Sequence, residues 1–558
     1  MTGLSIQAAP AALALAFCTP VLAQAALQDT DITTDDLSAA GAGTLGTMTL
    51  ETGGLSVEMW ADSNLERIKF LLSRVDLSQA SPAVRALVRK IMLTEARLPD
   101  GASEEDNQAI FAERVRILFE MGDVIALEQL MERLSQTASR IFPGYVRINL
   151  GQLLLRDGLE AGCAAPGRDA PAPEFGREWV GKVNAACANL GEAGPEGEVQ
   201  LQLAVDLDPD DTLFPQLMAR LRGESDEAPE LDGALKLDPL HIALMEKTGI
   251  ALEPRHLAYV TPDALVGLAR SGRAPALVRA MAAEQAMAWG IITPADVRLI
   301  YNQLALQANA GEITAPPEAE DTLNRAREFA RLAQALDPSG RGRDVIRMLE
   351  RAKAEQSLRI TAMVYADMVA RIAPGPDTII HGATVLRALI LTGRNDEARV
   401  WHTAIVNEAR TGLGVALRQL FEVWPLLVAS GPEVGADGAS VLAVDWYNFA
   451  LQQYGRAGID KAIAVFSLTE AMGEPIAAEA WDRIIAARAA SRTKADLPNL
   501  SIWRGIAEAA GARRQAEAGL LAVLLLDGGQ FEKAHPVVTS AILGAFLSAG
   551  METDARAL

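Results

Sequence analysis

The sequence is poor in the residues on which most catalytic and metal sites depend. Its 558 residues include only three cysteines and five histidines, and aromatic residues make up 5% of the chain. No histidine lies in an H-E-x-x-H pattern or beside another, and no cysteine cluster could supply the missing ligands. We therefore predict no metal site and no cofactor. The histidines are interpreted as core or helix-face residues: His241, His256, His381, His402 and His535.

Positive charge and long hydrophobic runs are scarce as well. The chain has 51 Lys and Arg against 72 Asp and Glu, a net charge of −21, which argues against binding nucleic acid through a general basic field. The longest apolar run near the C-terminus, residues 518–526, has nine residues, whereas a membrane-spanning helix needs about 20. We expect no stable membrane insertion and a buried helix at 518–526.

The first 25 residues carry no charged side chain. An apolar stretch from about Ala11 to Leu22 leads into Ala-Gln-Ala at residues 23–25, the A-x-A form of a secretory cleavage site, although the usual preceding basic residues are missing. We predict a signal peptide over residues 1–25, which would remove Cys18. Abundant alanine, and arginine in large excess over lysine, are typical of a GC-rich bacterium. The predicted location is the periplasm, with secretion as the alternative.

Two of the three cysteines, Cys163 and Cys187, flank a loop rich in proline, glycine and alanine. In an oxidising compartment such a pair predicts a disulfide. The residues on both sides of the loop have a helical pattern, so the bond would staple a helical hairpin and stabilise it by about 3 kcal/mol on the chain-entropy argument. The alternative is a redox-active pair, which would favour C-x-x-C spacing and an activated thiolate.

From about Ser56 onward the apolar residues follow a helical period. Residues 65–75 and 127–134 place them at i, i+3, i+4 and i+7, and no segment alternates as a strand would. Helix starts are marked by a hydroxyl residue before proline at 81–82, 261–262 and 293–294, and by capping boxes at Ser103 and Thr293. The sequence therefore predicts an all-α protein with helices of about 12–18 residues.

Several predicted turns share one form, in which a glycine ends one helix in the left-handed conformation and an alanine lets the next helix pack closely. The pairs are Gly393 with Ala398, Gly529 with Ala534 and Gly550 with Ala555, and looser versions begin at Gly122 and Gly458. These are the turns of tetratricopeptide-type hairpins, although no fixed 34-residue period is present. We predict an α-solenoid of divergent helical hairpins, a tetratricopeptide-like superhelix; an irregular helical bundle is the alternative.

Composition divides the chain into five parts. Residues 1–25 are the predicted signal peptide, and 26–55 are a polar leader expected to be disordered. Residues 56–308 form an N-terminal helical-repeat region, 309–321 a Pro- and Gly-containing linker, and 322–558 a C-terminal helical-repeat region.

Two short sequence patterns match binding motifs by their letters but lack the surrounding features that such sites require. The letters GAGTLG at 41–46 match G-x-G-x-x-G but lack the strand and helix that a dinucleotide site requires. Asp206, Asp208 and Asp210 resemble the start of a calcium loop, but Asp211 stands where glycine is needed and Leu217 where glutamate is needed. We interpret this segment as an acidic turn between helices.

The order Cys163, Trp179, Cys187, followed by residues 234–249 and 278–301, resembles a group of alphaproteobacterial envelope proteins. These are exported, all-helical and loosely tetratricopeptide-like, and some carry the automatic label antifreeze glycopeptide polyprotein. The resemblance implies no catalytic residue. The predicted scaffold is also similar to the superhelix of soluble lytic transglycosylases, but the only Glu-Ser pair, Glu224-Ser225, lies in a polar loop without the catalytic stretch.

These observations favour a non-enzymatic periplasmic scaffold or adaptor that binds a protein or peptide partner, in cell-envelope assembly or integrity. The alternatives are a peptidoglycan- or glycan-acting enzyme whose carboxylate lies on a helix, and a binder of a small ligand inside the superhelix. We predict no catalytic, cofactor-binding or metal residue. The sequence pattern indicates no particular oligomeric state.

Overall fold

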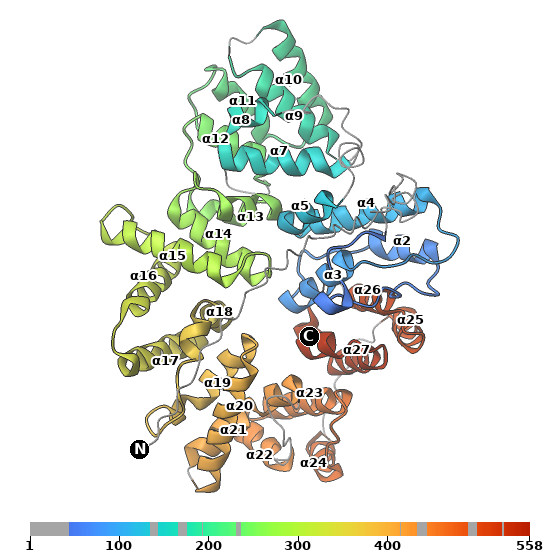
Figure 1. The fold of residues 1–558 in the computed structure, drawn as a ribbon, viewed down its shortest axis with the longest axis vertical. Coiled ribbons are helices and arrows are strands. Elements are labelled where there is room, and N and C mark those ends of the chain that lie inside the picture. Colours follow the sequence, from blue (N-terminus) through green and yellow to red (C-terminus); the bar gives the residue numbers. More distant parts are fainter. Residues whose placement is uncertain are drawn as a thin grey trace, which may run out of the picture. The chain divides into compact units, whose positions relative to one another are not determined.

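The computed structural model describes residues 44–133, 143–165, 176–191, 194–229, 231, 236–412, 414–431, 443–488, 499–526 and 529–558. Within these ranges the chain is all-helical and has no strand, as predicted; two isolated bridges join Met48 to Thr94 and Leu237 to Val260 (Figure 1). The predicted signal peptide lies outside the described residues. None of the described helices combines the length and apolar content needed to cross a bilayer.

The helices of the first part of the chain are α2 (Leu65–Ser73), α3 (Pro82–Leu93), α4 (Glu104–Glu120), α5 (Val124–Glu132), α7 (Pro143–Asp157), α8 (Leu159–Cys163), α9 (Arg177–Ala188), α10 (Pro195–Leu207), α11 (Leu213–Leu221), α12 (Pro239–Lys247), α13 (Pro262–Arg270), α14 (Ala276–Ala288) and α15 (Pro294–Asn309). Short 3-10 turns are η2 (Leu50–Thr52), η3 (Pro254–Tyr259), η4 (Pro317–Ala319), η5 (Ile379–His381) and η7 (Phe531–Lys533).

The remaining helices are α16 (Glu320–Gln334), α17 (Pro338–Ala354), α18 (Leu358–Val369), α19 (Gly382–Leu391), α20 (Asn395–Arg410), α21 (Gly414–Ser430), α22 (Ala443–Tyr454), α23 (Ala457–Ala471), α24 (Ala478–Arg488), α25 (Leu500–Gly511), α26 (Gln515–Leu525), α27 (Pro536–Ser548) and α28 (Glu552–Ala557). The apolar run at 518–526 falls in α26 and its end, where Ala518 and Leu520–Val523 are buried, as predicted.

Side-chain caps fix most of the predicted helix starts. Ser81, Ser103 and Thr293 each accept a hydrogen bond from a backbone N–H of the first turn, and the last two complete capping boxes with an aspartate. Thr261 stands before α13 without such a cap bond. The proline after it still begins the helix because its φ suits the first turn and its missing N–H costs nothing there.

The left-handed glycine is confirmed at four of the predicted turns and is wrong at one. At Gly529 the partner alanine is not in a helix as predicted, because Ala534 follows the 3-10 turn η7 and precedes α27. Gly122, Gly393, Gly529 and Gly550 have φ between 68° and 80°, the left-handed region that glycine enters without strain. Gly458 instead lies inside α23, buried against α22, where a Cβ would stand 2.3 Å from the Ala450 carbonyl oxygen. The left-handed residue of that turn is Gly455, and Gly458 allows the two helices to approach closely.

Residues 44–55 correct the boundary of the leader that we predicted to be disordered. The backbone N–H groups of Thr47 and Met48 donate to the Leu93 carbonyl, each at 2.9 Å, and Glu95 N–H donates back to the Met48 carbonyl at 2.8 Å. Leu55 is buried, and its N–H donates to Thr94 Oγ1 at 3.1 Å. This segment is ordered because the backbone after α3 supplies donors and acceptors that its composition does not reveal.

Most helices pack on their neighbours in the chain, and a large core runs through α5 and α7–α24. The predicted linker at 309–321 joins α15 to α16, which pack on each other within this core. Buried side chains on both sides of this segment belong to the same hydrophobic cluster. The division of the chain into two helical-repeat regions at this point stays a prediction.

A second core unites helices from opposite ends of the chain. Buried side chains of α2–α5 and of α25–α28 belong to one cluster, and α26 contacts both α2 and α3 (Figure 1). Glu517 of α26 is fully buried, and its carboxylate accepts from Ser63 Oγ and Arg67 Nη1, each at 2.8 Å. The charge of Glu517 is thereby compensated across two segments about 450 residues apart.

Candidate functional site

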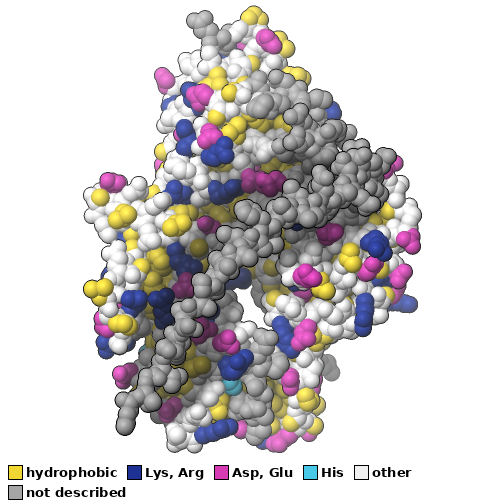
Figure 2. All heavy atoms as spheres, in the orientation of Figure 1, with side chains coloured by type: hydrophobic (Ala, Val, Ile, Leu, Met, Phe, Trp, Pro, Cys, Tyr) yellow, Lys and Arg dark blue, Asp and Glu magenta, His cyan; other side chains and the backbone are white. Residues whose placement is uncertain are grey.

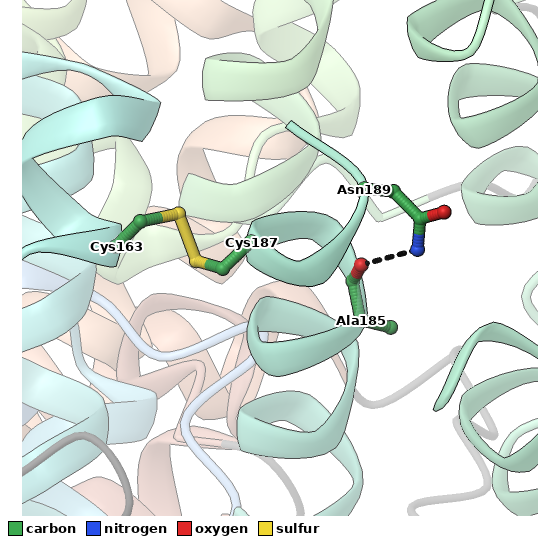
Figure 3. The surroundings of a disulfide bond; sticks show 4 residues. All are labelled: Cys163, Ala185, Cys187 and Asn189. Carbon is green, nitrogen blue, oxygen red and sulfur yellow. Dashed lines mark hydrogen bonds between the residues drawn. A yellow bond between two sulfur atoms is a disulfide. The ribbon is translucent and has the colours of Figure 1, made fainter. Parts of the chain in front are cut away.

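The predicted disulfide is present and joins α8 to α9. Cys163 is the last residue of α8 and Cys187 lies near the end of α9, with their Cα atoms 5.3 Å apart (Figure 3). Both side chains are half-buried against the large core. The bond holds the C-terminal end of α9 against α8, so α9 cannot tilt away from the core at that end.

A second contact, on the other side of α9, holds α10. Figure 3 shows Asn189 pointing away from the disulfide, and its Nδ2 donates to the Ala185 carbonyl at 2.8 Å and to the Gly197 carbonyl at 3.0 Å. A Cβ at Gly197 would stand 3.1 Å from the Ala188 carbonyl oxygen. The first turn of α10 therefore lies close to the end of α9, and only a glycine fits there comfortably.

A buried charge cluster holds the opposite end of α10. Lys182 of α9 is 4% exposed, and its Nζ donates to Asp211 and, at 2.6 Å, to Asp208 Oδ2 in the turn after α10. His241 of α12 contacts the same turn, with its Nε2 3.0 Å from Asp211 Oδ2 and its Nδ1 3.0 Å from Asp238 Oδ1. The charge cluster, Lys182, Asp208, Asp211, Asp238 and His241, thus ties α9, α10 and α12 together.

Electrostatics keep His241 protonated. Burial by itself would lower the pKa of His241, but the charge of Asp238 and the hydrogen bonds with Asp211 and Asp238 outweigh burial and raise it to about 10. Burial opposes ionisation of both aspartates, yet His241 holds their pKa values below the usual range. Each charge has an opposite partner within the protein, which suits a structural role better than proton transfer.

The aspartates compared with a calcium loop form the predicted acidic turn in part: Asp208 and Asp210 lie in the turn between α10 and α11, whereas Asp206 lies in the last turn of α10. Asp206 accepts from Gln202 Nε2 at 2.8 Å, Asp208 accepts from Lys182, and Asp210 is exposed between α10 and α11. Across the described part of the chain, no group of three or more His, Cys, Asp or Glu side chains is arranged to hold a metal ion.

Between α9 and α10 lies a hollow of about 790 Å³, which we call the α9–α10 groove. Its walls combine small, polar and leucine side chains: Gly181, Asn184 and Ala188 of α9, and Glu196, Gly197, Gln200, Leu203, Ala204 and Leu207 of α10. Cys187 of the disulfide also lines it. A Cβ on Gly181 would come within 4 Å of only one described side-chain atom, Leu207 Cδ1 at 3.9 Å, so this wall is open.

One edge of the groove is an exposed apolar ridge. Val199, Leu203 and Leu207 follow each other at four-residue intervals along α10 and are 67%, 58% and 40% exposed. Such an i, i+4, i+8 row is the ridge that normally packs into a groove of another helix. The opposite apolar face of α10, with Leu201 and Val205, packs against the large core instead.

The surroundings of this apolar ridge are acidic. Residues 189–211 contain Asp and Glu at seven positions and no Lys or Arg. Glu198 pairs with Arg222 at 2.7 Å, whereas Glu196, Asp206 and Asp210 make no ion pair with a described lysine or arginine. At the top of Figure 2, where α10 lies in Figure 1, hydrophobic and acidic side chains share the surface.

A second hollow, of about 530 Å³, lies beside the turn that contains Gly393. Arg298 and Arg394 both line it, and both donate to the carboxylate of Asp367. Arg298 holds the pKa of Asp367 below its ordinary value, mainly through this hydrogen bond. Because the carboxylate already engages both guanidinium groups, this hollow is a weaker candidate for a ligand than the α9–α10 groove.

The best candidate for a helix-borne catalytic carboxylate is Glu284 of α14, and its surroundings are structural. Its carboxylate accepts from Tyr301 Oη, from Thr322 Oγ1 at 3.0 Å, and from Arg325 through Nε at 3.0 Å and Nη2 at 2.6 Å. Glu284, Tyr301 and Thr322 are all buried. A general acid needs access to the glycosidic oxygen, and this one faces only its protein donors.

Two tryptophans and the five histidines lie in structural positions. Trp401 and Trp446 are buried, and their Nε1 groups donate to the carbonyls of Ile372 and Phe421 at 3.0 and 2.9 Å. These tryptophans are core residues. The five histidines are dispersed over α12, η3, η5, α20 and the N-cap of α27: His241, His256, His381, His402 and His535.

The sequence interpretation missed both the groove and the charge cluster. The four-residue spacing of Val199, Leu203 and Leu207, in a stretch without a cation, was the available signal. It was ambiguous because Leu201 and Val205 offer a second apolar face on the same helix. In comparisons with known proteins, no family model, no curated protein and no solved structure matches this chain.

Proposed function

We propose that the mature chain is a non-enzymatic periplasmic scaffold or adaptor that binds a protein or peptide partner in the α9–α10 groove. The observation that carries the proposal is the exposed ridge Val199, Leu203 and Leu207 beside the α9–α10 groove. A contiguous row of apolar side chains exposed to water is typical of an interaction site, where a partner would bury it. Export rests on the signal-like residues 1–25.

The proposal includes a tetratricopeptide-like stacking of helical hairpins. Consecutive helices pack against each other, and alternate helices also touch, as α17 does α19 and α19 does α21. Contacts of these two kinds are expected when hairpins stack in a row. Such a scaffold presents helix faces rather than loops, and α10 supplies the face proposed here. A role in envelope assembly or integrity is the context that we propose for it.

The experiment fills the groove without disturbing the fold. Gly181→Leu places a side chain where Leu207 is the only described neighbour. Gly544→Leu is the matched control, because Gly544 lies in α27 with no described atom within 4 Å of its Cβ position. Leucine favours helix more than glycine does, so both variants should fold. Each purified protein is immobilised and exposed to periplasmic extract, and bound proteins are quantified by mass spectrometry.

We expect a reproducible set of proteins to bind the wild type and Gly544→Leu alike, and to fall at least tenfold with Gly181→Leu. Equal capture by all three proteins would refute the groove as the binding site. Release of soluble fragments from purified peptidoglycan by the wild-type protein would instead support the glycan-acting alternative.

A further inference from the structure

We propose that the segment received by the α9–α10 groove is an amphipathic helix whose apolar face is bordered by lysine and arginine. This inference rests on the proposed function and names the chemistry of the partner. It draws on three independent features of the described residues: the geometry of the apolar ridge, the sign of the surrounding charge, and the rigidity of the groove walls.

Ridge geometry favours a helix over an extended peptide. Val199 to Leu207 spans eight residues, about 12 Å or two turns of helix. An i, i+4 row of side chains fits between the rows of another helix at one of the preferred crossing angles. An extended peptide would need a sheet edge with unpaired backbone groups, and the described part of the chain contains no strand to provide one.

Space for the partner's side chains lies beside the ridge. Opposite Leu207, Gly181 leaves the α9 wall without a side chain, and its Cβ position has a single described neighbour at 3.9 Å. Gly197 and Ala204 line the groove along α10 and leave room above them, because they have no side chain larger than a methyl group. Apolar side chains at i, i+4 and i+7 of a partner helix could therefore enter the groove and cover Leu203 and Leu207.

The sign of the charge selects among amphipathic helices. Glu196 stands at the start of α10, and Asp206 and Asp210 stand at its end, while no cation occurs between residues 189 and 211. The nearest lysine, Lys182, is buried and already paired with Asp208 and Asp211. Lysine or arginine flanking the partner's apolar face would meet these carboxylates, and an acidic helix would be repelled.

Rigid walls lower the cost of binding. The disulfide fixes the end of α9, Asn189 joins that end to the first turn of α10, and Lys182 joins the middle of α9 to the turn after α10. Because these contacts fix α9 and α10 relative to each other, little conformational entropy remains to be lost when a partner helix docks.

The test uses three fluorescein-labelled synthetic helices of 18 residues with the same leucine face. Their polar positions carry lysine and glutamine, glutamate and glutamine, or glutamine alone. Fluorescence anisotropy measures their binding to the full mature protein at low and at moderate salt. The protein variants are Gly181→Leu with its control Gly544→Leu, and Glu196→Gln/Asp206→Asn with its control Glu104→Gln/Glu105→Gln, which removes two acids from the first turn of α4.

We expect the lysine peptide to bind at least tenfold more tightly than the glutamate peptide and to weaken with added salt. Gly181→Leu should weaken it at least tenfold, Glu196→Gln/Asp206→Asn about threefold to tenfold, and both controls less than twofold. Equal affinity for the three peptides would overturn the inferred charge preference while the groove remained the binding site.

Two further outcomes separate this inference from the proposed function. Lysine-peptide binding that Gly181→Leu leaves unchanged would mean attraction to the acidic surface at large, and would overturn the inference. If no peptide binds but Gly181→Leu still abolishes capture from the extract, the groove functions with a partner that is not an amphipathic helix. If neither measurement depends on Gly181, the proposed function itself fails.

Discussion

At the scale of single residues, buried charge decides how this protein is held together. His241, Glu284 and Glu517 are buried, and each faces charged or hydroxyl partners, most of them from other segments of the chain. Burying an isolated charge has a large unfavourable desolvation free energy, which hydrogen-bonded or oppositely charged partners offset in part. The partners can do so only when the segments that carry them are arranged in one specific way. These residues therefore act as positional constraints, and their role is visible only through their partners.

Histidine 241 should make stability depend on pH in a defined window. In the folded protein its pKa is raised to about 10, whereas in the unfolded chain it is about 6.5. Between these values the folded state binds more protons, so the free energy of unfolding should fall as pH rises, by at most about 1.4 kcal/mol per pH unit. The contribution is complete below pH 6.5 and lost near pH 10.

The measurement is urea denaturation of the wild type and His241→Gln at several pH values from 6 to 10. We expect the stability advantage of the wild type to be largest at pH 6 and to shrink as pH rises. His535→Gln, at the N-cap of α27, controls for the loss of a histidine elsewhere. A constant difference between wild type and His241→Gln would contradict a proton held on His241.

At the scale of secondary-structure elements, two devices bring helices together: a covalent bond and a glycine. The disulfide joins α8 to α9 across 24 residues of sequence, and Gly458 lets α23 approach the backbone of α22. Mutations at the two sites destabilise the protein in different ways. Removal of the disulfide increases the entropy of the unfolded chain, whereas a side chain at Gly458 creates a steric clash in the folded protein.

Loss of the disulfide should destabilise the helices that form the groove. For the double variant Cys163→Ser/Cys187→Ser we expect the free energy of unfolding to fall by about 3 kcal/mol, because the unfolded chain regains the entropy of a loop of this length. Thermal denaturation with and without a reductant measures this. The reductant should lower the midpoint of the wild type and leave the double variant unchanged; a wild-type midpoint insensitive to full reduction would refute the stabilising role.

Gly458→Ala should destabilise the protein although alanine is the better helix former. Its Cβ would stand 2.3 Å from the Ala450 carbonyl oxygen, which forces α22 and α23 apart. We expect a loss of about 1–3 kcal/mol, the usual cost of overpacking. Gly544→Ala, in an open helical position, should instead be neutral or stabilising by up to about 1 kcal/mol. Equal midpoints in thermal denaturation would contradict the close approach.

At the scale of the whole molecule, the first and the last described α-helices share a core. Helices α25–α28 bury their apolar faces with α2–α5, and Glu517 adds hydrogen bonds to Ser63 and Arg67. In an open helical array, each terminal repeat needs a polar outer face to cover the apolar core. When the terminal helices share a core instead, less apolar surface is exposed at the two ends of the array.

Cleavage between α24 and α25 should therefore leave the protein associated. A specific protease site inserted between residues 488 and 499 allows the peptide bond to be cut in the purified protein. We expect the fragment with α25–α28 to co-elute with the remainder in size-exclusion chromatography and to separate from it in urea. Glu517→Ala, which leaves Arg67 and Arg514 without their buried partner, should promote dissociation. Spontaneous separation of the wild-type fragments in native buffer would contradict a shared core.

Much of the local structure followed from sequence because it depends on residues a few positions apart. The caps at Ser81, Ser103 and Thr293, the buried helix at 518–526 and the left-handed Gly393 are consequences of backbone geometry within one or two turns. The pairing of Cys163 with Cys187 was equally accessible, since the chain offers those two cysteines across a single loop.

Tertiary structure alone decided which helix faces are covered. Both faces of α10 are apolar, and only the position of α9 determines that Val205 is packed while Val199 and Leu203 stay exposed. The partners of Glu517 and His241, and the burial of Gly458 in α23 rather than at its start, likewise depend on contacts between distant segments. Local periodicity sets what a helix can bury, and the packing of its neighbours determines what it does bury.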